Sequence, residues 1–220
     1  MAGPHGKTIS TIGNARNYLQ IRLSPNGKRV AVSETGSGQL IAGLSVLDLG
    51  NGVASPLTGS KVGSAADPVW SPDGETLAFN AIQENGRQLF TQRVGSSTPT
   101  LAVESADEPK WLDDWSANGK FLLFHLWRPS KLFAASLDEP RIARLLIETT
   151  ESIDGAHFSP DGNWIVYRRG GDDANWDQDD WGFTGVNPAS MPVQPKIQLW
   201  AVPFGGGDPK PLGEGGDNPV

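Results

Sequence analysis

Short runs of alternating apolar and polar residues recur along this chain, and a turn sequence interrupts each pair of runs. The clearest example is Pro68-Val69-Trp70, which is followed by Ser71-Pro72-Asp73-Gly74 and then by Thr76-Leu77-Ala78-Phe79. Short runs of this kind, bounded by Pro, Asp and Gly, are typical of half-buried β-strands. The pattern therefore predicts strands joined by tight turns.

The turn sequence occurs four times at nearly regular spacing. Its copies are Ser24-Pro25-Asn26-Gly27, Ser71-Pro72-Asp73-Gly74, Ser116-Ala117-Asn118-Gly119 and Ser159-Pro160-Asp161-Gly162. Their serines lie 47, 45 and 43 positions apart. A strand-rich repeat of about 40–50 residues is typical of a β-propeller, so we predict an all-β fold of four four-stranded blades.

Each residue of the turn has a physical role. Proline presets φ at the second position, Asp or Asn suits the third, and Gly accepts a positive φ at the fourth. A type I turn followed by a left-handed Gly commonly joins two antiparallel strands. The residue before each serine is expected to pack between blades; these residues are Leu23, Trp70, Trp115 and Phe158.

The repeat divides the chain into a lead and four blades. The lead covers 1–17, and its residues 7–12 are a candidate closing strand. The predicted blades are 18–60, 61–106, 107–150 and 151–220. Residues 141–147 also fit a short helix, but the matching segments of the other repeats favour a strand.

Composition excludes several classes of protein. The net charge of −7, with Lys and Arg scattered singly, argues against nucleic-acid binding. The absence of cysteine excludes disulfides and thiolate chemistry. No stretch approaches the ~20 apolar residues of a membrane span, and residues 1–10 lack the apolar core of a signal peptide.

The second repeat, residues 68–79, resembles the repeat of TolB-type, WD40-like β-propellers. Related repeats occur in propellers of prolyl-oligopeptidase-type (S9) peptidases and of bacterial Ser/Thr kinases. The kinase-linked propellers are the most similar, on Asp114-Trp115-Ser116-Ala117-Asn118-Gly119-Lys120-Phe121-Leu122-Leu123-Phe124 and Val202-Pro203-Phe204. The resemblance covers about 18–220.

The resemblance implies a non-catalytic module that binds a protein or peptide partner, often outside the cytoplasm. The peptidase and kinase motifs are absent from the sequence: it has no Gly-x-Ser-x-Gly, His-Arg-Asp or Asp-Phe-Gly. One alternative is a propeller belonging to an S9 peptidase whose catalytic domain lies outside this chain. Another is a propeller enzyme that acts on a sugar or lactone through a metal.

Propellers of this family usually have six to eight blades. The segment Asn218-Pro219-Val220 matches the approach to Trp70, so we expect a fragment of a larger propeller. Open blade faces would then be expected to favour self-association. A closed four-bladed ring and a dimer of eight blades are the alternatives.

The fourth repeat carries an insert of 30 residues between Tyr167 and Gln198, where the second repeat has 8. The insert is rich in acids and aromatics: Asp172, Asp173, Trp176, Asp177, Asp179, Asp180, Trp181 and Phe183. Such a loop on a rigid scaffold is a candidate partner-binding element. A solvated loop that covers the blade edge is the alternative, and we favour it; a Ca²⁺ site formed by the acids is a third interpretation. Without the Gly and distal Glu of a calcium loop, no metal or cofactor is expected.

A second candidate set comprises acids at the entry of the innermost strands: Asp67, Asp113, Asp154 and Asp217. They would approach the axial funnel of a propeller, where carboxylates could hold a basic peptide or a cation. Ordinary turn chemistry is the alternative, and we favour it. We expect the histidines His5, His125 and His157 to be isolated near strand ends, and the turn serines to have no nucleophilic role.

Overall fold

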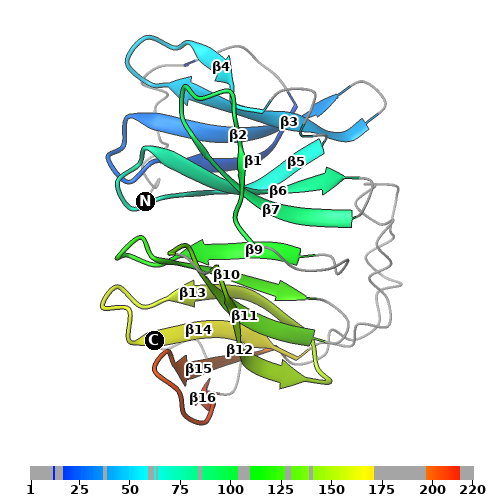
Figure 1. Ribbon diagram of the computed structural model, residues 1–220, viewed down its shortest axis with the longest axis vertical. Helices are drawn as coiled ribbons and strands as arrows, with labels where there is room; N and C mark the ends of the chain where they lie inside the picture. The colour runs from blue at the N-terminus through cyan, green and yellow to red at the C-terminus, as the bar shows by residue number, and fades with distance from the viewer. Residues whose placement is uncertain are drawn as a thin grey trace, which may run out of the picture.

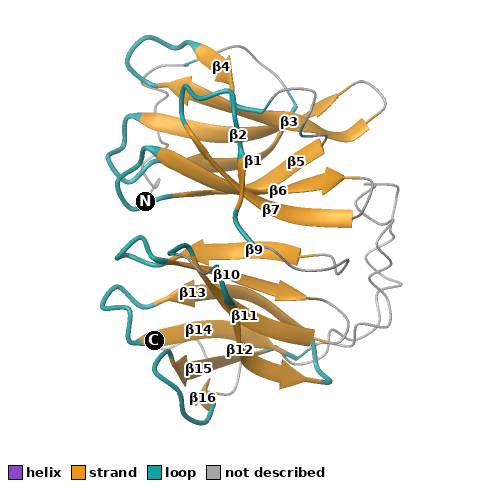
Figure 2. Cartoon of the chain, in the orientation of Figure 1, coloured by secondary structure: helices purple, strands orange, loops and turns teal. Residues whose placement is uncertain are grey.

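The computed structural model describes residues 12, 17–36, 39–58, 62, 64–83, 86–103, 110–126, 130–138, 141–170 and 197–213. These residues form sixteen strands in four sheets, which confirms the predicted all-β propeller arrangement. Figure 1 shows the first two sheets in the upper half of the molecule and the last two in the lower half. Strands and loops make up all of the described chain in Figure 2, and none of its segments is a helix able to cross a membrane.

Each sheet is built from four consecutive strands. Blade 1 contains β1 (Tyr18–Leu23), β2 (Arg29–Gly36), β3 (Gln39–Asp48) and β4 (Ala54–Pro56). Blade 2 contains β5 (Ser64–Trp70), β6 (Thr76–Gln83), β7 (Gly86–Arg93) and β8 (Thr100–Leu101). Blade 3 contains β9 (Lys110–Trp115), β10 (Phe121–Leu126), β11 (Ser130–Ser136) and β12 (Ala143–Thr149). Blade 4 contains β13 (Ile153–Phe158), β14 (Trp164–Arg169), β15 (Gln198–Pro203) and β16 (Lys210–Gly213).

Strand order in every sheet follows the sequence, and all neighbouring strands are antiparallel. The first strands of successive blades contact one another, from β1 to β5, β5 to β9 and β9 to β13. They therefore form the inner side of the array, and β4, β8, β12 and β16 form its outer edge. The segment that also fitted a helix is the strand β12.

The hydrophobic core lies between blades rather than within one layer. Leu77 and Phe79 of blade 2 pack with Leu44 and Val46 of blade 1. A second cluster joins blades 2 and 3, and a third joins blades 3 and 4. Burying one such leucine or phenylalanine contributes about 1.5–3 kcal/mol, so each blade depends on its neighbour for stability.

The residues before the turn serines follow the prediction in three blades. Trp70, Trp115 and Phe158 pack in the clusters between blades. Leu23 of blade 1 is instead 60% exposed, because the described residues place no sheet against that side of β1.

The four turns have the expected conformation. Gly27, Gly74, Gly119 and Gly162 have φ of 68°, 69°, 75° and 71°, the left-handed values predicted for this position. Each glycine N–H donates to the carbonyl of its turn serine, at 2.8–2.9 Å.

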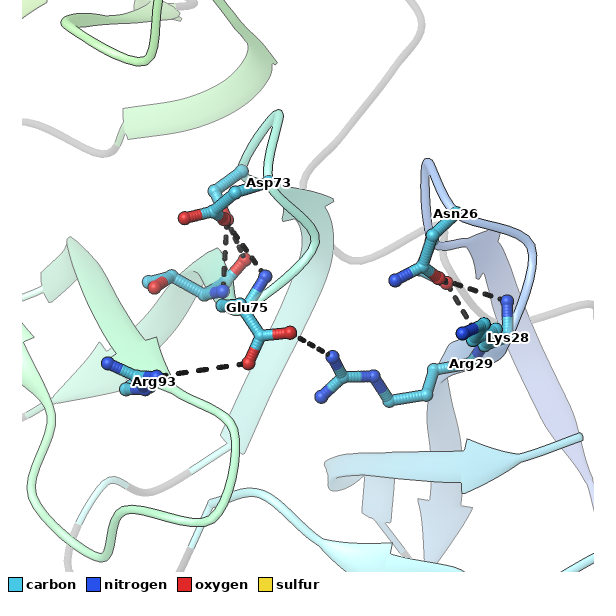
Figure 3. Close-up of polar contacts among 9 residues, drawn as sticks. Asn26, Lys28, Arg29, Asp73, Glu75 and Arg93 are labelled. Carbon is cyan, nitrogen blue, oxygen red and sulfur yellow. Dashed lines mark hydrogen bonds and ion pairs between the residues drawn. The ribbon is translucent and has the colours of Figure 1, made fainter. Parts of the chain in front are cut away.

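The hydroxyl of the turn serine forms hydrogen bonds that the sequence analysis did not predict. Ser71 Oγ accepts a hydrogen bond from the Thr76 N–H at 2.9 Å and donates to Asp73 Oδ1 at 2.5 Å. The Asp73 carboxylate also accepts from the Glu75 N–H (Figure 3). The same bonds recur around Ser24, Ser116 and Ser159. Each serine hydroxyl therefore ties the turn to the second strand.

Candidate functional site

The first strand of every blade contains a β-bulge, and this feature positions the predicted funnel residues. The pairing between first and second strands skips residues at Leu19, at Asp67 and Pro68, at Asp113, and at Gly155 and Ala156. A bulge inserts an extra residue, bends the strand and redirects a side chain. Asp67 itself has a φ of 53°, which is uncommon for a residue other than glycine.

The bulges also correct the predicted strand boundaries. The same alternating pattern that predicts a strand at 68–70 also predicts first strands at 112–115 in blade 3 and 156–158 in blade 4. The observed strands β5, β9 and β13 begin at Ser64, Lys110 and Ile153. The alternation is lost at the bulge because the extra residue shifts every preceding side chain to the opposite face. Asp67 and Asp113 therefore lie within strands and not in turns.

In each blade, the polar residue at the bulge pairs with the side chain nine positions after the turn serine. The partners on the second strand are Ser33, Asn80, His125 and Arg168. Ser33 Oγ donates to Gln20 Oε1 at 3.2 Å, and Asn80 Nδ2 donates to Asp67 Oδ2 at 2.5 Å. His125 Nδ1 lies 2.8 Å from Asp113 Oδ2, and Arg168 Nε donates to Asp154 Oδ1. We call these four contacts the bulge pairs.

The bulge pairs share one position on the second strand but differ in charge. Blade 1 has a neutral pair, blade 2 joins an acid to an amide, blade 3 joins an acid to histidine, and blade 4 joins an acid to arginine. The pair of blade 3 is buried, since the side chains of His125 and Asp113 are only 6% and 5% exposed. The side chains of Arg168 and Asp154 are 52% and 46% exposed.

Burial controls the protonation of the Asp113–His125 pair. Burial raises the pKa of Asp113, and the nearby His125 offsets part of this effect. Burial alone would lower the pKa of His125, but Asp113 beside it, with Asp154 and Asp67 farther away, raises that pKa above its usual 6.5. Both shifts favour proton binding, and the raised pKa of His125 keeps a proton on the pair as the pH rises above 6.5. His125 is therefore paired, and the expectation that it stands isolated was wrong.

Bulge residues also link successive blades. Gln20 Oε1 accepts from the Asp67 N–H at 2.8 Å, and Gln20 Nε2 donates to Asp67 Oδ1 at 2.5 Å. Asp113 Oδ1 accepts from the Ala156 N–H at 3.3 Å. In both cases a side chain at one bulge accepts from a backbone N–H in the next bulge.

The junction between blades 2 and 3 uses aromatic contacts. Arg87 Nη1 lies 3.5 Å from Asp67 Oδ2, and its guanidinium lies 4.9 Å from the centre of the Trp111 ring. The Trp111 ring in turn stacks on His125, with ring centres 5.9 Å apart. A continuous series of polar and aromatic contacts thus runs from Gln20 in blade 1 to Ala156 in blade 4.

His157 lies beside this series and is more accessible. Its Nδ1 is 3.6 Å from Asp114 Oδ2, and its side chain is 67% exposed. Asp114 Oδ2 also accepts from the Phe158 N–H at 2.9 Å. The nearby Asp114 carboxylate is the main cause that raises the pKa of His157. His157 therefore also has an acidic partner.

Most of these residues have partners within the fold. Asp67, Asp113 and Asp154 each have a partner on the second strand of their own blade, so they do not form a ring of free carboxylates. Within the described segments, no group of three or more His, Asp or Glu residues is arranged to hold a metal ion. Asp217, His5 and every candidate residue of the insert, from Asp172 to Phe183, lie outside the described residues.

Several residues that build this region had not been predicted from the sequence: Gln20, Ser33, Asn80 and Arg168. A common offset of nine from the turn serine could have revealed Ser33, Asn80, His125 and Arg168 as one row. The residues at the bulges stand four, three and five positions before their serines, so no fixed offset identifies them.

Comparison with known structures agrees with this architecture. TolB from Agrobacterium tumefaciens superposes with a TM-score of 0.67 at 18% identity, over 87% of this chain and 63% of that one. The fold is that of the TolB β-propellers. TolB from Acinetobacter baumannii gives a TM-score of 0.64 at 15% identity, over 90% of this chain and 44% of that one. A prolyl endopeptidase structure gives 0.61 at 17% identity, over 89% of this chain and 28% of that one.

The chain thus spans less than two thirds of the length of these structures. No known protein-family model matches the sequence, and no curated protein matches it. These comparisons show a shared fold, and the proteins that share it are two TolB propellers and a propeller-bearing peptidase.

Proposed function

We propose that this chain is a non-catalytic β-propeller module that binds a protein or peptide partner, of the TolB-like or kinase-linked kind. The observation that supports this most strongly is the use of the inner acids and histidines in bulge pairs and blade junctions. Asp113 and His125 are buried against each other, so they serve the scaffold better than they would serve acid–base catalysis on a substrate. Partner recognition then falls to the loops that the scaffold carries.

The insert is the proposed recognition element. Its acids and aromatics, Asp172 to Phe183, would attract a basic peptide and provide stacking surfaces. It is flanked by β14 and β15, whose pairing runs from Trp164–Pro203 to Arg169–Gln198. A loop of this length on a rigid hairpin is a suitable position for a binding element.

A peptide-display selection against the whole chain tests this proposal. We expect the selected peptides to be rich in Lys and Arg. We also expect a variant with Trp176→Ala and Trp181→Ala to bind them about tenfold more weakly, which corresponds to about 1.4 kcal/mol. Asp138→Asn, an exposed acid on blade 3, is the control and should leave binding unchanged. Peptides that bind both variants equally would show that the insert is not the recognition element.

The second candidate function is the propeller of an S9-type peptidase, because a prolyl endopeptidase is among the structures with this fold. In that case the chain would control access to a catalytic domain encoded elsewhere. Sequencing of the surrounding gene separates the two functions: a Gly-x-Ser-x-Gly motif after this segment favours the peptidase, and an adjoining kinase domain excludes it.

A further inference from the structure

The outer strands of the four blades differ in length and in proline content. In blades 1, 2 and 4 the outer strands β4, β8 and β16 have 3, 2 and 4 residues. A proline lies within or directly before each of them: Pro56, Pro99 and Pro211. Short length and proline both protect a sheet edge from pairing with another strand. The outer strand of blade 3, β12, has 7 residues and contains no proline, so it lacks both protections.

The outer side of β12 presents unpaired backbone groups. The Ser136 N–H of β11 donates to the Ile142 carbonyl at 3.0 Å. Hydrogen bonding alternates along an antiparallel ladder, so the N–H and C=O groups of Ala143 and Leu145 point away from β11. Among the described residues, no strand pairs with that side of β12. Leu145 is 45% exposed and Ile142 is 62% exposed, so apolar side chains accompany the open backbone.

Contacts with both neighbouring blades hold β12 in place. Arg141 Nη1 donates to the Leu101 carbonyl of blade 2 at 2.6 Å. Arg144 Nη2 donates to the Phe204 carbonyl of blade 4 at 2.5 Å, and its guanidinium lies 4.9 Å from the centre of the Phe204 ring. The edge is therefore ordered before any partner arrives, which lowers the entropic cost of pairing.

The charges along this segment are self-complementary. Arg141 and Arg144 lie in its first half, and Glu148 and Glu151 lie in its second half. The side chains of the two acids are 55% and 51% exposed. The ladder to β11 skips Leu146, which lies midway between the two halves. An antiparallel second copy would place the basic half of each strand beside the acidic half of the other, and opposite charges stabilise such pairs.

We propose that β12 pairs with β12 of a second copy of this chain, antiparallel, about a two-fold axis near Leu146. The outward backbone groups of Ala143 and Leu145 bond to the second half of the other strand, so the two blades form one continuous sheet. The contact is isologous and occupies the open edge of both copies, so the assembly ends at two chains. It uses the rim of the array rather than a blade face, and it goes beyond the proposed recognition by the insert.

Sedimentation equilibrium of the full chain at concentrations up to about 1 mM tests this proposal, because a contact of this size is weak. We expect a monomer–dimer equilibrium. Leu145→Pro removes an outward N–H but none that faces β11, and an edge strand tolerates proline there. We expect it to raise the dissociation constant by at least about tenfold. Leu145→Ala is the matched control: it keeps the N–H and should raise the constant by no more than about threefold.

Charge reversal tests the orientation of the two strands. Arg144→Glu and Glu148→Lys each remove the attraction between the two halves, so each variant alone should dimerise about fivefold more weakly. A mixture of the two variants should form a heterodimer more readily than either variant forms a homodimer. A purely structural role for Arg144 would not produce this rescue, and the mixture remains informative if Leu145→Pro fails to fold by circular dichroism.

Three results would overturn the proposal. The first is a chain that stays monomeric over the whole concentration range. The second is a dimer that folded Leu145→Pro leaves intact, or growth beyond two copies, because the contact would then lie elsewhere or would not be isologous. The third is a mixture of the charge variants that associates no better than its components.

Discussion

The turns and the bulges occur once in each blade, yet they differ in how closely the four copies agree. All four turns use a serine hydroxyl, an Asp or Asn side chain and a left-handed glycine in the same hydrogen bonds. All four bulges lie in the first strand of their blade, but their side-chain pairs range from Gln20–Ser33 to Asp154–Arg168. The repeat therefore holds the turn chemistry constant and varies the chemistry of the inner strands.

This difference has a structural reason. A turn satisfies its backbone groups locally, so only a few residue types fit its dihedral angles. A bulge pair needs only a donor and an acceptor of suitable length. Different pairs can therefore occupy the same place, and the electrostatics of each junction can change from blade to blade.

The largest expected effect comes from breaking the buried bulge pair. His125→Leu leaves the Asp113 carboxyl buried without its partner, so we expect a loss of about 3–5 kcal/mol in the free energy of unfolding, measured by urea titration. His125→Asn recreates the acid–amide pair of blade 2 and should cost only about 1 kcal/mol. Equal losses in the two variants would show that the pairs are not interchangeable.

A smaller loss is expected when a turn serine is removed. Ser71→Ala deprives the Thr76 N–H and the Asp73 carboxylate of their shared hydroxyl, so the free energy of unfolding should fall by about 1–2 kcal/mol. Ser24→Ala and Ser116→Ala should lower the free energy of unfolding by similar amounts, because the hydrogen bonds around these serines are the same. Costs that differ widely among the three buried serines would contradict the equivalence of the turns.

Glycine substitution in the turns is expected to cost about 1–2 kcal/mol. Gly119→Ala forces a Cβ into a left-handed conformation at φ 75°, although no atom lies within 4 Å of the added carbon. Gly205→Ala is the control, since its Cβ also meets open space and its φ is not positive. Because neither added Cβ is crowded, the difference in thermal unfolding between the two variants measures the cost of the left-handed backbone conformation.

Stability should also depend on pH through the junction of blades 3 and 4. The folded chain holds protons on Asp113, His125 and His157 more tightly than the unfolded chain does, because the pKa of each is raised. The free energy of unfolding should therefore fall as the pH rises above the usual histidine value of 6.5. Urea titrations between pH 6 and pH 8.5 measure this slope. His125→Asn with His157→Asn should flatten it, and a slope unchanged in that variant would rule out these histidines.

The smallest effect is expected at the surface contact between the first two turns. Figure 3 shows Glu75 between Arg29 and Arg93, with Arg29 Nη2 lying 2.6 Å from Glu75 Oε1. The pair is partly exposed, so Glu75→Gln should cost about 0.2–1 kcal/mol. The cost should shrink as salt is added, and a salt-independent loss would point to packing of Arg29 on Trp70 instead.

The repeat and its strands were predictable because the signals are local. Period, alternation and turn residues placed the second strands close to their observed positions, and they assigned the left-handed glycines correctly. The bulge pairs were not predictable in this way. Asp113 and His125 are twelve positions apart, and a bulge between them removes the alternation that would place both on one face.

The sequence by itself determined the number of blades in this segment, the chemistry of the turns and the hairpin order, because each depends on residues close together in the chain. The tertiary structure alone decided that the inner acids have partners and that His125 is buried against Asp113. Those outcomes depend on which side of a strand meets the next blade. Packing between sheets sets that side, and the bulges leave no fixed spacing for the polar residues of the first strands.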